Sequence, residues 1–233
     1  MVMGSRGAET ITLLLDPEGR PVAPQPSWVA ESQIAGDRYT PPVIAGDPDE
    51  NVVGLWSRAL PGGASVVVGQ HLVGPGAADG LVFELAEPRP AESRQIADLA
   101  AAAPDVFLAV WGERGWDWNF MAWQRFRSDG TLLPTATHEI WVGGKPRVAV
   151  SGDGRGLVVG ECREPGSSYA IICAQLIGPE GELLGPSFVM PRVLGGDQKR
   201  PVVAVDGAGR FLVAWYEQDP KGKNATLSIR RFR

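Results

Sequence analysis

The chain has 233 residues, of which 44% are hydrophobic and 21% charged, with a net charge of −5. This length suffices for a buried core, and the 30 Gly and 20 Pro, spread along the chain, favour many short strands joined by turns over disorder. The acidic balance argues against a nucleic-acid partner, and no apolar run is long enough to cross a bilayer. Residues 1–10 also lack a stretch of signal-peptide length, so the sequence as given predicts a soluble, cytoplasmic chain.

The N-terminal segment looks like the middle of a later one. Residues 13–22, Leu-Leu-Leu-Asp-Pro-Glu-Gly-Arg-Pro-Val, match residues 175–184, Gln-Leu-Ile-Gly-Pro-Glu-Gly-Glu-Leu-Leu. The chain therefore begins inside a repeated unit, and residues 9–40 are predicted to hold closing strands and a linker.

Three further segments align without gaps: residues 42–56, 146–160 and 201–215. In each, an apolar strand runs into a Gly/Asp turn and then into a second apolar strand. A weaker fourth copy ends at Trp111. The second strands end at Trp56, Trp111, Gly160 and Trp215, so the spacing between copies is close to fifty residues.

A third strand with a shared pattern follows each copy, and a turn and a fourth strand come after it. The equivalent positions in the third strand are Gln70, Gln124, Gln175 and Arg230. Four strands per unit at this period predict an all-β fold, a small β-propeller of about four four-stranded blades. The expected blades are residues 41–89, 90–144, 145–199 and 200–233, in one domain. A β-sandwich of the same hairpins is the alternative.

The two chain ends predict how the ring closes. The last copy stops after its third strand, so an N-terminal strand is expected to complete that blade. Residues 10–15 and 227–232 both look like third strands, however. Either one blade carries an extra strand, or the ends pair between two chains, which leaves a monomer and a strand-swapped dimer both open.

Residues 91–103 resist the strand pattern because Ala, Glu and Leu give them strong helix propensity. We expect a short helical turn followed by a strand over 97–103.

Cys162 and Cys173 are predicted to lie on neighbouring strands of one hairpin. They are too few for a tetrahedral zinc site, and no metal or cofactor is expected. A disulfide is one reading of the pair, and two buried, inert thiols are the favoured one.

The units Pro-x-Val-Ala-x-Asp-x-x-Gly-x-Phe-Leu-Val-Ala-Trp, with a Gln/Arg-x-Phe strand and an Asp-Gly turn after them, resemble the propeller-type repeats of bacterial, often secreted or surface-attached, proteins. Gly196-Asp197-Gln198 is similar to their inter-blade linker, and Gly36-Asp37-Arg38 is a looser match. Gly160 and Ala97 depart from the pattern. The resemblance implies the architecture and an extracellular location, and it implies no single chemistry.

Variable loops on a rigid scaffold are where binding residues concentrate. In a propeller the loops between second and third strands and the inter-blade linkers share one face, which we call the second face. The candidate ligand-binding residues there are Trp116, Asp117, Trp118, Asn119, Tyr169, Arg38, Tyr39, Lys199 and Arg200. The aromatic rings suit sugars or an apolar ligand, unless the two tryptophans fold back onto their blade and the charges form inter-blade salt bridges.

The sequence therefore favours a non-enzymatic binding module for a carbohydrate, a small apolar ligand or a protein partner. No nucleophile motif, phosphate loop or calcium loop is present, and neither His71 nor His138 lies in a catalytic pattern, so no catalytic residue is assigned. The alternative is an enzyme, glycosidase-like or a specialised biosynthetic catalyst, that uses paired carboxylates at the propeller mouth. The acidic candidates are Glu113, Asp117, Glu161 and Glu217. A pure scaffold is the third possibility.

Overall fold

The structure is a computed structural model of the chain. It describes residues 2–6, 9–13, 18, 20, 27–31, 42–60, 65–73, 77–78, 82–85, 93–114, 119–134, 140–141, 144–163 and 168–232.

Nineteen antiparallel strands form five sheets in this part of the chain. The first sheet contains β1 (Val2–Arg6), β2 (Glu9–Leu13) and β3 (Ser27–Glu31). The second contains β4 (Val43–Gly46), β5 (Val52–Ala59), β6 (Ser65–Val73), β7 (Ala77–Ala78) and β8 (Phe83–Glu84). The third contains β9 (Ser93–Ala103), β10 (Val106–Arg114), β11 (Asn119–Phe126) and β12 (Ile140–Trp141). The fourth contains β13 (Gly144–Val150), β14 (Gly156–Cys162), β15 (Ile171–Ile177) and β16 (Phe188–Val189). The fifth contains β17 (Gln198–Val205), β18 (Phe211–Gln218) and β19 (Ala225–Phe232).

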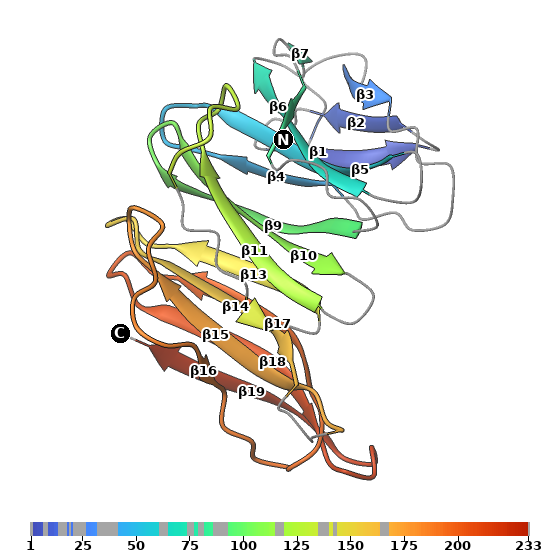
Figure 1. Ribbon diagram of the computed structural model, residues 1–233, viewed down its shortest axis with the longest axis vertical. Helices are drawn as coiled ribbons and strands as arrows, with labels where there is room; N and C mark the ends of the chain where they lie inside the picture. The colour runs from blue at the N-terminus through green and yellow to red at the C-terminus, as the bar shows by residue number, and fades with distance from the viewer. Residues whose placement is uncertain are drawn as a thin grey trace.

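Each sheet pairs its strands in chain order, except that β8 pairs with β6, and the sheets follow one another along the molecule (Figure 1). The first strand of each repeat contacts the first strand of the next, β4 with β9, β9 with β13 and β13 with β17. A series of small antiparallel sheets with adjacent inner strands is the arrangement of propeller blades. The all-β propeller class is therefore confirmed, and the sandwich alternative is set aside.

The hydrophobic core lies between successive sheets. Phe211, Val213 and Trp215 of the fifth sheet pack against the fourth sheet. The other face of the fourth sheet meets the third, where Trp123 packs with Val158. Burial on both faces explains why the inner strands read as continuous apolar runs.

The glutamine of the third strand has the same structural role in two repeats. Gln124 Nε2 donates to the carbonyl oxygens of Arg125 and Leu133, both at 2.7 Å. Gln175 Nε2 donates to those of Leu176 and Gly185, at 2.8 and 3.1 Å. Because these buried amides satisfy the backbone of the segment that follows the third strand, the repeated glutamine is a residue of the scaffold.

The closing blade differs from the expectation. Strands β1, β2 and β3 hydrogen-bond to one another, and in the described part of the chain β19 pairs only with β18. Among the described N-terminal strands none completes the fifth sheet, because β1, β2 and β3 pair with one another and contact β4 and β7.

The helical turn expected before residue 97 is wrong. Residues 93–103 are one continuous strand, β9, which pairs with β10 from Ser93 to Ala103 with two register shifts. Ladder hydrogen bonds and burial of Leu99 against its neighbours override the helix propensity of the alanines.

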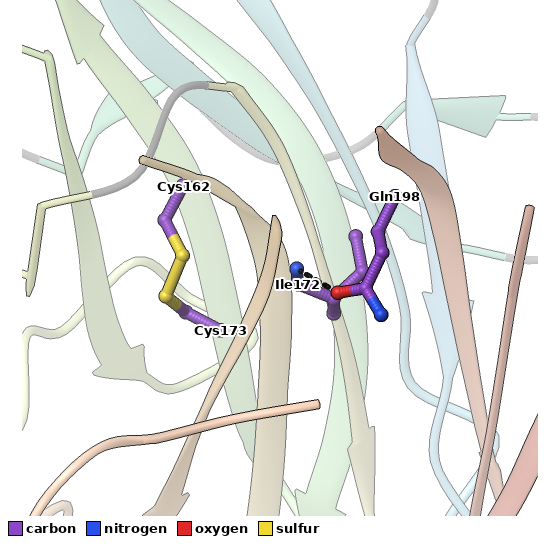
Figure 2. Close-up of a disulfide and its surroundings, with 4 residues drawn as sticks. All are labelled: Cys162, Ile172, Cys173 and Gln198. Carbon is purple, nitrogen blue, oxygen red and sulfur yellow. Dashed lines mark hydrogen bonds between the residues drawn. A yellow bond between two sulfur atoms is a disulfide. The ribbon is translucent and has the colours of Figure 1, made fainter. Parts of the chain in front are cut away.

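Cys162 and Cys173 form a disulfide, which corrects the favoured reading of two free thiols (Figure 2). Their Cα atoms are 5.9 Å apart on β14 and β15. The partners of these cysteines in the ladder are Ile171 and Gly160, so the bridge is diagonal and not between directly opposed residues.

Candidate functional site

The turns between first and second strands lie on the face opposite the second face and stabilise themselves. Asp47 Oδ1 accepts the backbone N–H groups of Asp49 and Asn51 at 3.0 and 2.8 Å. Asp206 Oδ1 accepts those of Ala208 and Arg210 at 2.9 and 3.0 Å. Two repeats thus use an aspartate at the same position to satisfy a tight turn, which makes these turns structural. The longer loops of the second face hold the candidate site.

Five of the nine predicted site residues lie outside the described residues: Trp116, Asp117, Trp118, Arg38 and Tyr39. Asn119 begins β11, and only its backbone is described. The remaining three, Tyr169, Lys199 and Arg200, come from the loop after β14 and from the start of β17. We call this region, where the fourth and fifth sheets meet at the second face, the β14–β17 junction.

Asp197 makes hydrogen bonds that hold the β14–β17 junction together. Its Oδ1 accepts the N–H of Ala170 at 2.8 Å, and Lys199 Nζ donates to its Oδ2 at 2.7 Å. The hydrogen bond from Lys199 lowers the pKa of Asp197; burial opposes the shift, and the Ala170 N–H and the charges of Lys199 and Arg163 add to it. The charge of Lys199 is therefore paired within its own linker.

Gln198 connects the fourth and fifth sheets beside Asp197. Its Oε1 accepts the N–H of Ile172 at 3.0 Å, and its Nε2 donates to the carbonyl of Pro191 at 3.0 Å (Figure 2). The side chain is fully buried. It anchors the linker to β15 and so fixes the backbone positions of the neighbouring Lys199 and Arg200.

Arg200 is held in a conformation that non-glycine residues rarely adopt, with φ of +55°. The ladder between β17 and β18 is irregular at this point, between Lys199 and Val202. The N–H of Arg200 donates to Glu161 Oε1 on β14 at 2.9 Å, and its side chain is exposed. Strained residues held by a neighbouring sheet cluster at functional sites, so this bulge marks the junction as a candidate.

Two of the predicted acidic residues are structural. Buried Glu113 accepts the indole N–H of Trp111 at 2.9 Å. Buried Glu217 Oε1 accepts the N–H groups of Val193 and Leu194 at 2.5 and 2.6 Å. Burial alone would raise the pKa of Glu217, but hydrogen bonds from the linker outweigh it and the pKa is lowered. Glu217 is thus held ionised, which does not suit a general acid.

Sequence reasoning missed Asp98. This carboxyl lies on the inner strand β9 and accepts the N–H of Val148 at 3.1 Å and that of Leu99 at 3.0 Å. Burial raises its pKa, although the two N–H groups and the charge of Arg147 act against the shift. Asp98 is the one carboxyl in the described part of the chain for which a raised pKa is resolved. No signal in the sequence distinguished it, because its partner lies fifty residues later, in the next sheet.

The described residues contain no group of three or more His, Cys, Asp or Glu side chains placed to hold a metal ion. They also contain no helix of the length and hydrophobicity needed to cross a membrane.

No family model matches the chain, and no curated protein does. Solved structures do. An α-L-arabinanase from Penicillium chrysogenum, complexed with arabinobiose, has a TM-score of 0.56 and 11% identity over 93% of this chain and 71% of that one. An endo-arabinase from Bacteroides thetaiotaomicron has a TM-score of 0.51 and 13% identity over 97% and 87%. A protein of unknown function from Dyadobacter fermentans has a TM-score of 0.54 and 16% identity over 95% and 72%.

At these identities the likeness concerns the fold alone. The two arabinanases are β-propeller proteins, and their match extends over nearly all of this chain. The sheet series described above is therefore a propeller-type fold by its own geometry and by comparison.

Proposed function

We propose that this chain is a carbohydrate-active propeller that hydrolyses glycosidic bonds. The observation that carries the proposal is the shared fold: two of the similar structures are arabinanases, and one of them is complexed with arabinobiose. A pentose-containing polysaccharide is therefore the first substrate class to test. This is the enzyme that the sequence offered as its alternative, and it has more support than a purely binding module.

Hydrolysis of a glycosidic bond needs one protonated and one ionised carboxyl group. We assign the acid to Asp98, because burial raises its pKa, which is the direction that a general acid requires, although its oxygens also accept the N–H groups of Leu99 and Val148. We assign the second carboxyl to Glu161. It is half-buried at the second face and accepts one N–H, that of Arg200, whereas Glu113 and Glu217 are buried.

The test is release of reducing ends from arabinan and arabino-oligosaccharides. We expect activity from the parent chain and a loss of about a hundredfold or more in kcat from both Asp98→Asn and Glu161→Gln. Asp153→Asn is the matched control, since this carboxylate belongs to a turn of the opposite face, where it accepts hydrogen bonds from Arg155 and Ser151. Full activity in either carboxyl variant would remove that residue's assigned role, and no release from any pentose polymer would overturn hydrolysis.

Binding without catalysis is the second candidate. It is favoured by the structural use of the second-face carboxylates, since Glu217 is held ionised by the linker and Asp197 is paired with Lys199. Here the ligand would contact the loop of Trp116 and Trp118 together with the remaining predicted residues, Asp117, Asn119, Tyr169, Arg38, Tyr39, Lys199 and Arg200.

Calorimetric titration with arabino-oligosaccharides separates the two candidates. Saturable heat with no reducing-end release supports the binding module, and we then expect Trp116→Ala and Trp118→Ala to weaken binding about tenfold or more each, because an aromatic platform supplies the sugar contact. Retention of full affinity by both variants would remove the loop from the site.

A further inference from the structure

The second strands of two repeats end with the same Trp-x-Glu sequence. Trp111 and Glu113 lie on β10, and Trp215 and Glu217 lie at the equivalent positions of β18. Residues two apart on a strand point to the same face of the sheet, and all four of these side chains are buried. In the third sheet the pair bonds to itself, since Trp111 Nε1 donates to Glu113 Oε1 at 2.9 Å.

The equivalent pair of the fifth sheet does not bond to itself. Glu217 Oε1 accepts the backbone N–H groups of Val193 and Leu194 instead, at 2.5 and 2.6 Å. The indole N–H of Trp215 has no hydrogen-bond partner within the described part of the chain, although this side chain is only 2% exposed. A buried donor without an acceptor costs free energy, so two sets of donors compete for the carboxylate of Glu217.

The donors that Glu217 binds belong to a short segment, residues 192–195, which we call the strap. The chain is fastened on both sides of the strap by other groups. Before it, the N–H of the buried Met190 donates to the carbonyl of Ile172 at 2.8 Å. After it, the carbonyl of Asp197 accepts the N–H of Gln218 at 2.8 Å. The strap can therefore move while its two ends stay in place.

The strap itself has little apolar packing to hold it down. Val193 is 72% exposed, and Leu194 is half-buried. Gly195 has φ of +77°, a region that glycine enters without strain, and glycines of this kind can absorb the backbone rotation of a moving loop. The hydrogen bonds from Val193 and Leu194 to Glu217 are thus a principal tie between the strap and the fifth sheet.

We propose that the strap is a lid with two positions and that Glu217 exchanges partners between them. In the closed position Glu217 binds the strap. In the open position it accepts the indole N–H of Trp215, as Glu113 accepts that of Trp111, and the freed strap amides bond to water. The new hydrogen bond offsets part of the loss, so opening costs less than it would for a carboxylate with no second donor. The lid thereby controls access to Glu217 from the second face, beside the β14–β17 junction.

Hydrogen exchange of single amides, measured by NMR on the full parent chain, tests whether the strap opens separately. We expect the amides of Val193 and Leu194 to exchange with one common protection and at least about tenfold faster than those of Met190 and Gln198, which flank the strap. Exchange of the strap amides at the rates of Met190 and Gln198 would overturn the lid. This comparison needs no substitution, so it decides even if a variant fails to fold.

Trp215→Phe tests the exchange of partners. It removes a hydrogen bond that exists only in the open position, so the strap amides should exchange about five to ten times more slowly than in the parent. A tryptophan that only fills space predicts the opposite, because the smaller ring leaves a cavity that loosens its surroundings. Unchanged or faster exchange would therefore contradict the proposal. Trp111→Phe is the matched control and should leave exchange of the strap unchanged.

Glu217→Gln tests the closed position. This variant keeps an oxygen that the indole N–H can reach but loses the charge that holds the strap, so the amides of Val193 and Leu194 should exchange at least about tenfold faster. The amide of Ile172 reports on the surroundings, because it is bonded to Gln198 Oε1, and its exchange should stay as in the parent. Strap exchange that does not respond to Glu217→Gln would mean that the carboxylate does not hold the lid closed.

Discussion

The buried side chain of Gln198 accepts the backbone N–H of Ile172 at 3.0 Å and thereby joins the fifth sheet to the third strand of the fourth (Figure 2). The same amide donates to the carbonyl of Pro191. One side chain thus satisfies both an inner-sheet donor and the linker that carries the candidate site, so linker position and sheet packing depend on each other.

Replacing Gln198 by leucine should lower the free energy of unfolding by about 1–3 kcal/mol, because it leaves the Ile172 N–H and the Pro191 carbonyl without partners inside the protein. Gln218→Leu is the matched control, since Gln218 makes neither hydrogen bond, and it should cost less. Urea denaturation measures both. Equal destabilisation by the two variants would mean that the amide contacts of Gln198 add nothing.

Reduction of the Cys162–Cys173 disulfide should destabilise the fourth sheet. The bridge closes a short loop between β14 and β15. Removing a cross-link of this size raises the conformational entropy of the unfolded chain and so lowers the free energy of unfolding by about 2–3 kcal/mol. We expect the urea midpoint to fall on addition of a reductant, and the Cys162→Ser, Cys173→Ser double variant to be insensitive to it. Two titratable thiols in the native, non-reduced protein would contradict the bridge.

The repeat was readable from sequence because its pattern is local. The Gly/Asp turns and the paired apolar strands around Trp56 and Trp215 recur within about fifteen residues, so aligned copies predict β5 and β18 directly. The propeller class follows from the period. Strand β9 was misread in part because its alanines favour helix when isolated, and only pairing with β10 makes it a strand.

The candidate site was harder to predict from the sequence than the repeat, because the contacts that set the ionisation of its carboxyl groups come from residues far away in the chain. Glu217 looked like a possible catalytic acid until the linker, more than twenty residues earlier in the chain, placed two N–H groups on it. Asp98 looked like a strand residue until burial against the next sheet raised its pKa. Spacing in the sequence carries no information about either contact.

Stability should fall with acid in part through Glu217. Its pKa in the folded protein lies below the ordinary value of 4.5, so the unfolded chain binds more protons in that range and the contribution of Glu217 is present above about pH 4.5 and lost as the pH falls through the folded pKa. The stability difference between the parent and Glu217→Gln should therefore shrink on acidification. Urea midpoints measured against pH test this, with exposed Glu180→Gln as the control; a difference that does not vary with pH would show that ionised Glu217 is not what holds the linker.

Gly196 should tolerate no side chain. A Cβ at this position would lie 2.6 Å from the carbonyl carbon of Asp219 and still closer to the carbonyl oxygen of Gln218, and both are backbone atoms that cannot move without shifting the end of β18. We expect Gly196→Ala to lower the free energy of unfolding by about 1–3 kcal/mol, as overpacking does. Gly207→Ala is the control, because a Cβ there meets nothing within 4 Å, and its free energy of unfolding should be within about 0.5 kcal/mol of the parent's.

Since the linker carries Asp197 and Lys199, Gly196→Ala should also weaken the binding of any ligand at the β14–β17 junction, while Gly207→Ala leaves that binding unchanged. Equal stability of the two variants would show that the linker is not packed against the end of β18 as described.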